Sequence, residues 1–190
     1  ELIHFGSAVP LGGKRFRLSR LLRGRRGTEW AMAQHVAQEN FTLLSTNALQ
    51  AVELPLEAVG ASIAVRARGL ADEAAEPIVS PVQGESLRPP SPVRLRCTRT
   101  GDGGLHTSWV RRSRSGWAWL DGIDVPLGES VERYRVRIDG QVGSILAETH
   151  EPEATFDAEQ LVPLGSGSLT LSIVQVGDFA ESRPATKIIT

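Results

Sequence analysis

The chain has 190 residues, of which 41% are hydrophobic and 23% charged, which is ordinary for a globular protein able to bury a core. Its 22 acidic and 21 basic residues nearly cancel, so net charge predicts neither a nucleic-acid binder nor an acidic tail. A single cysteine excludes an intramolecular disulfide framework, and no apolar run predicts a membrane span or a signal peptide. The first residue is Glu1 rather than Met, so we expect a piece of a longer polypeptide.

A strongly basic segment lies near the start of the chain. Its seven basic residues, with no acidic residue among them, are Lys14, Arg15, Arg17, Arg20, Arg23, Arg25 and Arg26. The segment has neither the interleaved aromatics of single-strand nucleic-acid binders nor the ending of a phosphate-binding P-loop. We therefore expect no direct nucleic-acid contact, and expect Arg23, Arg25 and Arg26 to pair with carboxylates such as Glu29 or with a neighbouring subunit.

The first half of the chain reads as mostly β-structure. Apolar and polar residues alternate over residues 15–18 and 62–68, which indicates strands. Residues 30–38 (WAMAQHVAQ) form the one plausible helix, with Thr28 as a possible N-cap. We expect residues 1–86 to form a β-rich module.

Three prolines in four positions mark the boundary of that module. Residues 87–92 read LRPPSP, and such prolines remove backbone donors and favour a stiff, extended connector. We place the domain junction there, so that residues 93–190 form a second domain.

The second half shows the clearer strand pattern. Alternating residues predict strands over 93–97, 105–109, 134–138, 168–173 and 187–189. The pattern predicts that Cys97 lies in the core and that Trp109, the last residue of the second of these strands, is buried. Asp139-Gly140 is a favoured turn pair after the third strand. Short strands at near-regular spacing over about 100 residues indicate a β-sandwich, so the predicted fold class is all-β.

The segment 111–129 (RRSRSGWAWLDGIDVPLGE) interrupts this pattern with tryptophans, arginines and Gly and Pro turns. Trp117 and Trp119 are two residues apart, so in an extended segment they project from one face. Exposed aromatic faces bind sugars or protein partners. The candidate interaction surface comprises Arg111, Arg112, Arg114, Trp117 and Trp119. Packing of the insertion against the sandwich and burial in a subunit interface are the alternatives.

Candidate catalytic and metal-binding groups are sparse. The four histidines are scattered and Cys97 has no thiol partner, so we predict no metal site and no cofactor. Asp121, Asp124 and Glu129 match no calcium loop, and the simpler expectation is that they pair with the arginines of the insertion. An enzyme using them would need two carboxyls facing a cleft, one with a raised pKa. We therefore predict no catalytic residues, with this enzyme as a rival hypothesis.

Residues from Pro89 onward resemble a fibronectin type III domain. The resemblance rests on the proline-rich entry, the strand ending in Trp109, Tyr134 on a middle strand and the closing GDFAESRPA segment. The sequence departs from that family at Leu169, where a tyrosine usually stands, and in the insertion after Trp109. The resemblance implies a fibronectin type III-like β-sandwich.

The sequence FGSAVPLGGKRFRLSRLLRGRRGTEWAMAQH, residues 5–35, resembles the closing part of a tail-hub domain in phage tail-tip proteins. Its most specific piece is LLRGRRGTE, residues 21–29. Together with SWVRRSRSGWAWLDGIDVPLGE, residues 108–129, it resembles the C-terminal part of the large baseplate protein of gene transfer agents and related siphophages. In that family a TIM-barrel-like region precedes hub and fibronectin-like modules. The resemblance implies a structural role in tail assembly and host-surface contact, exerted by binding and without catalysis.

The resemblance also implies partners and a location. Such hubs are trimers that contact distal-tail, hub and tail-tube proteins and the host surface. We therefore expect a homotrimer in the tail tip or baseplate of a phage-like particle, made in the bacterial cytoplasm. The rival hypothesis is a carbohydrate- or receptor-binding module in which the Trp117 and Trp119 face contacts cell-surface glycans.

Overall fold

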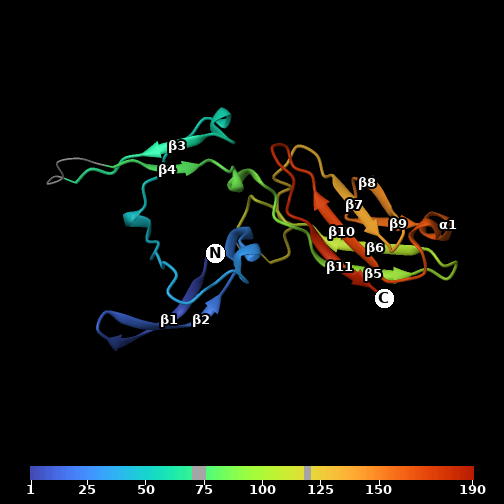
Figure 1. The fold of residues 1–190 in the computed structure, drawn as a ribbon, viewed down its shortest axis with the longest axis horizontal. Helices are drawn as coiled ribbons and strands as arrows, with labels where there is room; N and C mark the ends of the chain where they lie inside the picture. Colours follow the sequence, from blue (N-terminus) through green and yellow to red (C-terminus); the bar gives the residue numbers. More distant parts are fainter. Residues whose placement is uncertain (70–75, 118–120) are drawn as a thin grey trace. The chain divides into compact units, whose positions relative to one another are not determined.

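The computed structural model describes residues 1–69, 76–117 and 121–190. Contacts divide the chain into two compact units (Figure 1). The first comprises Glu1–His35 together with Leu87–Thr190, and the second comprises Val36–Ser86. Within the residues that are described, no helix is both long enough and apolar enough to cross a membrane.

The first unit contains a β-sandwich of seven antiparallel strands. One sheet has the order β5-β6-β9 and the other the order β11-β10-β7-β8. The strands are β5 (Val93–Arg99), β6 (Leu105–Val110), β7 (Tyr134–Asp139), β8 (Ser144–Thr149), β9 (Glu153–Phe156), β10 (Leu169–Gln175) and β11 (Ala185–Ile189). This arrangement of three strands against four confirms the predicted all-β, fibronectin type III-like fold class.

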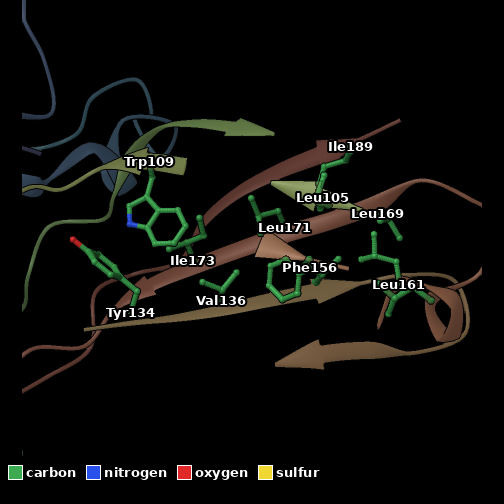
Figure 2. Close-up of a cluster of buried hydrophobic side chains, with 12 residues drawn as sticks. Leu105, Trp109, Tyr134, Val136, Phe156, Leu161, Leu169, Leu171, Ile173 and Ile189 are labelled. Carbon is green, nitrogen blue, oxygen red and sulfur yellow. The ribbon is translucent and has the colours of Figure 1, made fainter. Parts of the chain in front are cut away.

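Residues at every second position of the central strands form the core between the two sheets. Strands β6, β7 and β10 each bury alternate side chains, as a strand with one core-facing side requires. Figure 2 shows Trp109 and Tyr134 at one end of the cluster and Leu161 at the other. The rings of Trp109 and Tyr134 meet edge to face, with centroids 5.1 Å apart. Cys97 packs against this core but is only half-buried.

A short helix closes the end of the core opposite Trp109 and Tyr134 (Figure 2). α1 (Ala158–Leu161) is followed by the 3-10 turn η6 (Val162–Leu164), and both bury a leucine. The side chains of Asp157 and Gln160 form a reciprocal capping box, in which the Asp157 N–H donates to Gln160 Oε1 at 2.9 Å. The Asp-x-x-Gln spacing is a sequence signal for this helix that the periodicity argument missed.

The first unit also contains a β-hairpin that precedes the sandwich in sequence. β1 (His4–Gly12) pairs with β2 (Arg15–Leu22), which confirms the strand predicted at residues 15–18. Gly13 and Lys14 form the two-residue turn, with φ values of 57° and 60°. Positive φ at both central residues is the type I′ geometry that suits a tight hairpin.

The prediction of a helix over residues 30–38 is wrong. The structure has only the 3-10 turns η1 (Arg25–Gly27) and η2 (Glu29–Ala31) in this region. The Thr28 hydroxyl accepts the Leu2 N–H at 2.9 Å and donates to the Arg25 carbonyl at 2.8 Å, so it is not used as an N-cap. A helix this short needs tertiary packing along one face, and most of the segment is exposed.

The second unit is small and has little core. β3 (Ser62–Val65) pairs with β4 (Ile78–Pro81), which confirms part of the strand predicted at residues 62–68. Its 3-10 turns are η3 (Thr46–Ala48) and η4 (Leu56–Ala58), while η5 (Glu85–Leu87) spans its end. None of its described residues is buried.

The proline-rich segment 87–92 packs onto the sandwich instead of standing free. Pro89, Pro90 and Pro92 are buried. The Arg88 guanidinium donates to the Glu181 carbonyl at 2.5 Å, and the Ser91 hydroxyl donates to the Arg183 carbonyl at 2.7 Å. The proline-rich segment, the predicted second domain and the first 35 residues belong to one compact unit.

Candidate functional site

The arginines of the insertion 111–129 turn inward to carboxylates and carbonyls. Arg111 donates to Asp124 Oδ2 at 2.7 Å and to the Val125 carbonyl at 3.0 Å. Its Nε lies 3.7 Å from Glu132 Oε1, and its side chain is 14% exposed. Arg111 therefore ties the start of the insertion to its end.

Arg114 pairs with the most deeply buried carboxylate of the insertion. Its Nε donates to Glu129 Oε1 at 2.7 Å, and the Glu129 side chain is 1% exposed. The other oxygen of Glu129 accepts the Asp178 N–H at 2.9 Å. The Arg114 guanidinium also lies over the Phe179 ring, 5.7 Å from its centroid. The pair joins the insertion to the loop between β10 and β11.

Arg112 reaches outside the insertion. Its Nη2 donates to Glu29 Oε1 at 2.6 Å, which links the insertion to the 3-10 turn η2. The sequence suggests Glu29 as a partner for the basic segment, but here it pairs with Arg112. Pairing within the insertion is observed for Asp124 and Glu129, whereas Asp121 is exposed.

The predicted aromatic face lies only partly within the described residues. Trp117 is half-buried, and Trp119 lies outside the residues that the structure describes. A shared face of the two indoles therefore stays a prediction. All three arginines of the candidate interaction surface have carboxylate partners, which makes them parts of internal contacts.

Glu1 is the centre of a polar cluster beside the basic segment. Its carboxylate accepts hydrogen bonds from Arg23 Nη2 at 2.6 Å and from the Gly24 N–H at 2.7 Å, and it also contacts His35 Nε2. Arg23 donates in addition to the Met32 carbonyl at 2.9 Å. The Arg23 hydrogen bond is the main cause that lowers the pKa of Glu1 to about 2. The cluster holds the turn at Gly24 in place.

The other two arginines predicted as subunit contacts differ in burial. Arg25 is half-buried, and its N–H donates to the Leu2 carbonyl at 2.9 Å. Arg26 is exposed and has a left-handed backbone, with φ of 56°. A non-glycine residue in this region of backbone conformation is uncommon. Arg23 and Arg26 are both exposed, whereas Arg25 is half-buried.

The hairpin of β1 and β2 exposes apolar side chains on both faces, a feature that the sequence argument missed. Residues paired across the strands share a face, so Phe5 lies beside Leu21 on one side and Pro10 beside Phe16 on the other. Large apolar residues exposed on this hairpin are Phe5, Val9, Leu11, Phe16, Leu21 and Leu22. Apolar residues at both odd and even positions of the two strands are the signal that reveals such a hairpin.

Groups suited to metal binding are not brought together in the part of the chain that is described. No three His, Cys, Asp or Glu side chains there are placed to hold an ion. Cys97 is half-buried, and burial raises the pKa of its thiol.

One family matches the start of the chain. Residues 1–42 match the family described as Rcc01698-like, C-terminal. The matched segment contains the β1–β2 hairpin, the Glu1 cluster and both 3-10 turns that follow. No curated protein matches the chain.

Several solved structures are similar at low sequence identity. Domains d3–d4 of rat CD45 are 9% identical, with 96% of this chain and 93% of that chain covered and a TM-score of 0.41. A segment of two fibronectin type III domains from chicken tenascin is 16% identical, with 68% and 63% covered and a TM-score of 0.38. A structure of titin kinase and its flanking domains is 13% identical, with 54% of this chain but 17% of that chain covered and a TM-score of 0.38. The chain thus spans less than two thirds of the tenascin and titin chains, and its fold class rests on the strand order given above.

Proposed function

We propose that the chain is a structural component of a phage-like tail tip or baseplate, of the gene transfer agent or siphophage kind, and that it acts by binding without catalysis. The family match supports this proposal because it falls on the residues whose sequence resembles a tail hub. In this proposal the chain is made in the bacterial cytoplasm and joins hub, distal-tail and tail-tube subunits as a homotrimer.

The observation that carries the proposal is the exposed apolar hairpin. A two-stranded hairpin is marginally stable alone in water, and contiguous apolar surface on a folded protein marks an interaction site. Residues 2–28 have no acidic side chain, so the hairpin is basic as well as apolar. A surface with this chemistry suits an acidic, partly apolar protein neighbour.

The β1–β2 hairpin has large apolar side chains on both of its faces, which restricts how it can pack in an assembly. Phe5 and Leu21 lie on one face and Phe16 on the other, so covering a single face leaves large apolar groups in water. A hairpin inserted between two neighbouring subunits buries both faces at once. Rings of identical subunits provide such a position at every interface.

Particle assembly in producing cells tests the proposal. We expect the double variant Phe16→Ser and Leu21→Ser to leave the sandwich folded but to lose incorporation into particles, as measured by immunoblot of sedimented particles. The matched control is Val142→Ser, which removes an exposed apolar side chain from the loop between β7 and β8. Undiminished incorporation of the hairpin variant would contradict the proposal.

A further inference from the structure

The segment 36–59, which belongs to the second unit, exposes apolar side chains along its whole length. None of its residues is buried, and its large exposed apolar residues are Val36, Phe41, Leu43, Leu44, Leu49, Val52, Leu54, Leu56 and Val59. Chains that stay disordered in water have low hydrophobicity, and this segment does not. Apolar surface of this extent marks a place where another protein surface packs.

The same segment is acidic. It contains Glu39, Glu53 and Glu57 and no lysine, arginine or histidine. Glu53 and Glu57 are exposed, and they alternate with apolar residues in the sequence VELPLE, residues 52–57. The segment therefore presents carboxylates and apolar side chains together.

The β1–β2 hairpin has the opposite charge and a similar apolar character. Its exposed cations are Lys14, Arg15, Arg17 and Arg20. Arg17 lies opposite Val9 across the two strands, so a cation and an exposed apolar side chain share one face. The hairpin thus complements the segment 36–59 both in charge and in apolar surface.

Charge decides which of these surfaces can meet when two copies of the chain associate. Two hairpins repel each other, and so do two copies of the segment 36–59, because like charges that face each other are costly. The hairpin of one copy and the segment of another attract. Such a contact uses a different surface on each copy, and contacts of this kind repeat from subunit to subunit around a ring.

We propose that the segment 36–59 of one copy docks on the β1–β2 hairpin of a second copy. Its apolar side chains cover those of the hairpin, and Glu53 and Glu57 pair with Arg15 and Arg17. The inference rests on the proposed function and deepens it, because it names a second copy of this chain as the acidic, partly apolar neighbour of the hairpin.

Sedimentation velocity of the purified full chain tests the proposal. We expect association that grows with protein concentration and is weakened by salt. The double variant Glu53→Lys with Glu57→Lys, and separately Arg15→Glu with Arg17→Glu, places like charges opposite each other in the contact. Each should weaken association by at least about tenfold.

Mixing the two double variants restores opposite charges across the contact. The lysines in the segment of one chain then face the glutamates in the hairpin of the other, and the unchanged segment and hairpin face each other as before. We expect the mixture to associate as the unchanged chain does. Recovery in the mixture would also show that both variants are folded.

A control on the sandwich separates this contact from an effect of net charge. Glu151→Lys with Glu159→Lys changes net charge as much as the segment variant does, at two exposed positions, and should associate as the unchanged chain does. A chain that stays monomeric, an equal loss in this control, or no recovery in the mixture would each overturn the proposal. The last result is the one that docking within a single chain would give.

The particle assay separates this inference from the proposed function. A chain that stays monomeric, while Phe16→Ser with Leu21→Ser loses incorporation into particles, would overturn the inference and leave the proposed function supported. A chain whose association follows the charge variants as expected, while the hairpin variant is incorporated undiminished, would support the contact and contradict the proposed function.

Discussion

The Glu129 carboxylate accepts a hydrogen bond from Arg114 Nε at 2.7 Å while its own side chain is 1% exposed. Removing Arg114 leaves the buried carboxylate without its charged partner, with the Asp178 N–H as a remaining hydrogen-bond donor. We therefore expect Arg114→Ala to lower the free energy of unfolding by about 3 kcal/mol, measured by urea denaturation.

An exposed pair provides the control for this experiment. Arg137 Nε lies 2.8 Å from Asp139 Oδ1, but its side chain is 57% exposed. Arg137→Ala should cost no more than about 0.5 kcal/mol, because water replaces the lost partner. Equal effects of the two substitutions would show that the Glu129 carboxylate is not buried in solution.

Gly24 and Gly13 both have a positive φ, of 61° and 57°, but lie in different surroundings. A Cβ at Gly24 would lie 2.7 Å from Glu29 Cγ and 3.0 Å from Glu29 Cα, whereas at Gly13 it would meet nothing within 4 Å. Gly13→Ala should therefore cost about 1 kcal/mol, from backbone strain alone. Gly24→Ala should cost more and displace Glu29 from Arg112.

Amide hydrogen exchange measures how Gly24→Ala and Gly13→Ala differ in their effect on the turn beside Gly24. The Met32 N–H donates to the Glu29 carbonyl at 3.0 Å, so its protection reports on the turn that Gly24 closes. We expect Gly24→Ala to reduce this protection by at least about tenfold and Gly13→Ala to leave it unchanged. Similar protection in both variants would contradict the close packing around Gly24.

The sandwich core could be predicted from the sequence because its strands bury every second residue. Trp109 was expected to be buried and is, and Tyr134, on the strand predicted over 134–138, is buried as well. The predicted helix over 30–38 did not form because most of the segment is exposed, and a short helix without a packed face gains little from propensity alone. Strand β8 was missed because none of its residues is fully buried, which weakens the alternation that marks a half-buried strand.

The contacts of the insertion were predictable only where both partners lie in one segment. Arg111 with Asp124 and Arg114 with Glu129 follow from opposite charges within 111–129. The pair of Arg112 with Glu29 joins residues 83 positions apart, and no local pattern specifies it.

Tyr134 is the only tyrosine in the chain, so its ionisation can be followed by the ultraviolet absorbance of tyrosinate. Its side chain is buried, and its hydroxyl donates to Glu132 Oε1 at 2.6 Å. Burial, and then the Glu132 carboxylate, raise the pKa of Tyr134 above its ordinary value of 10.0. The folded state therefore favours the protonated phenol.

The sign of the pH effect follows from that shift. The stability contributed by the protonated phenol is fully present below pH 10.0, the ordinary pKa, and is lost as the pH rises above it. We expect no tyrosinate near pH 10 in the folded chain, and its appearance at higher pH together with loss of circular dichroism. In guanidinium it should appear near the ordinary pKa, and Glu132→Gln should lower the pH of onset in the folded chain. Tyrosinate that forms near pH 10 with the fold intact would contradict the burial of Tyr134.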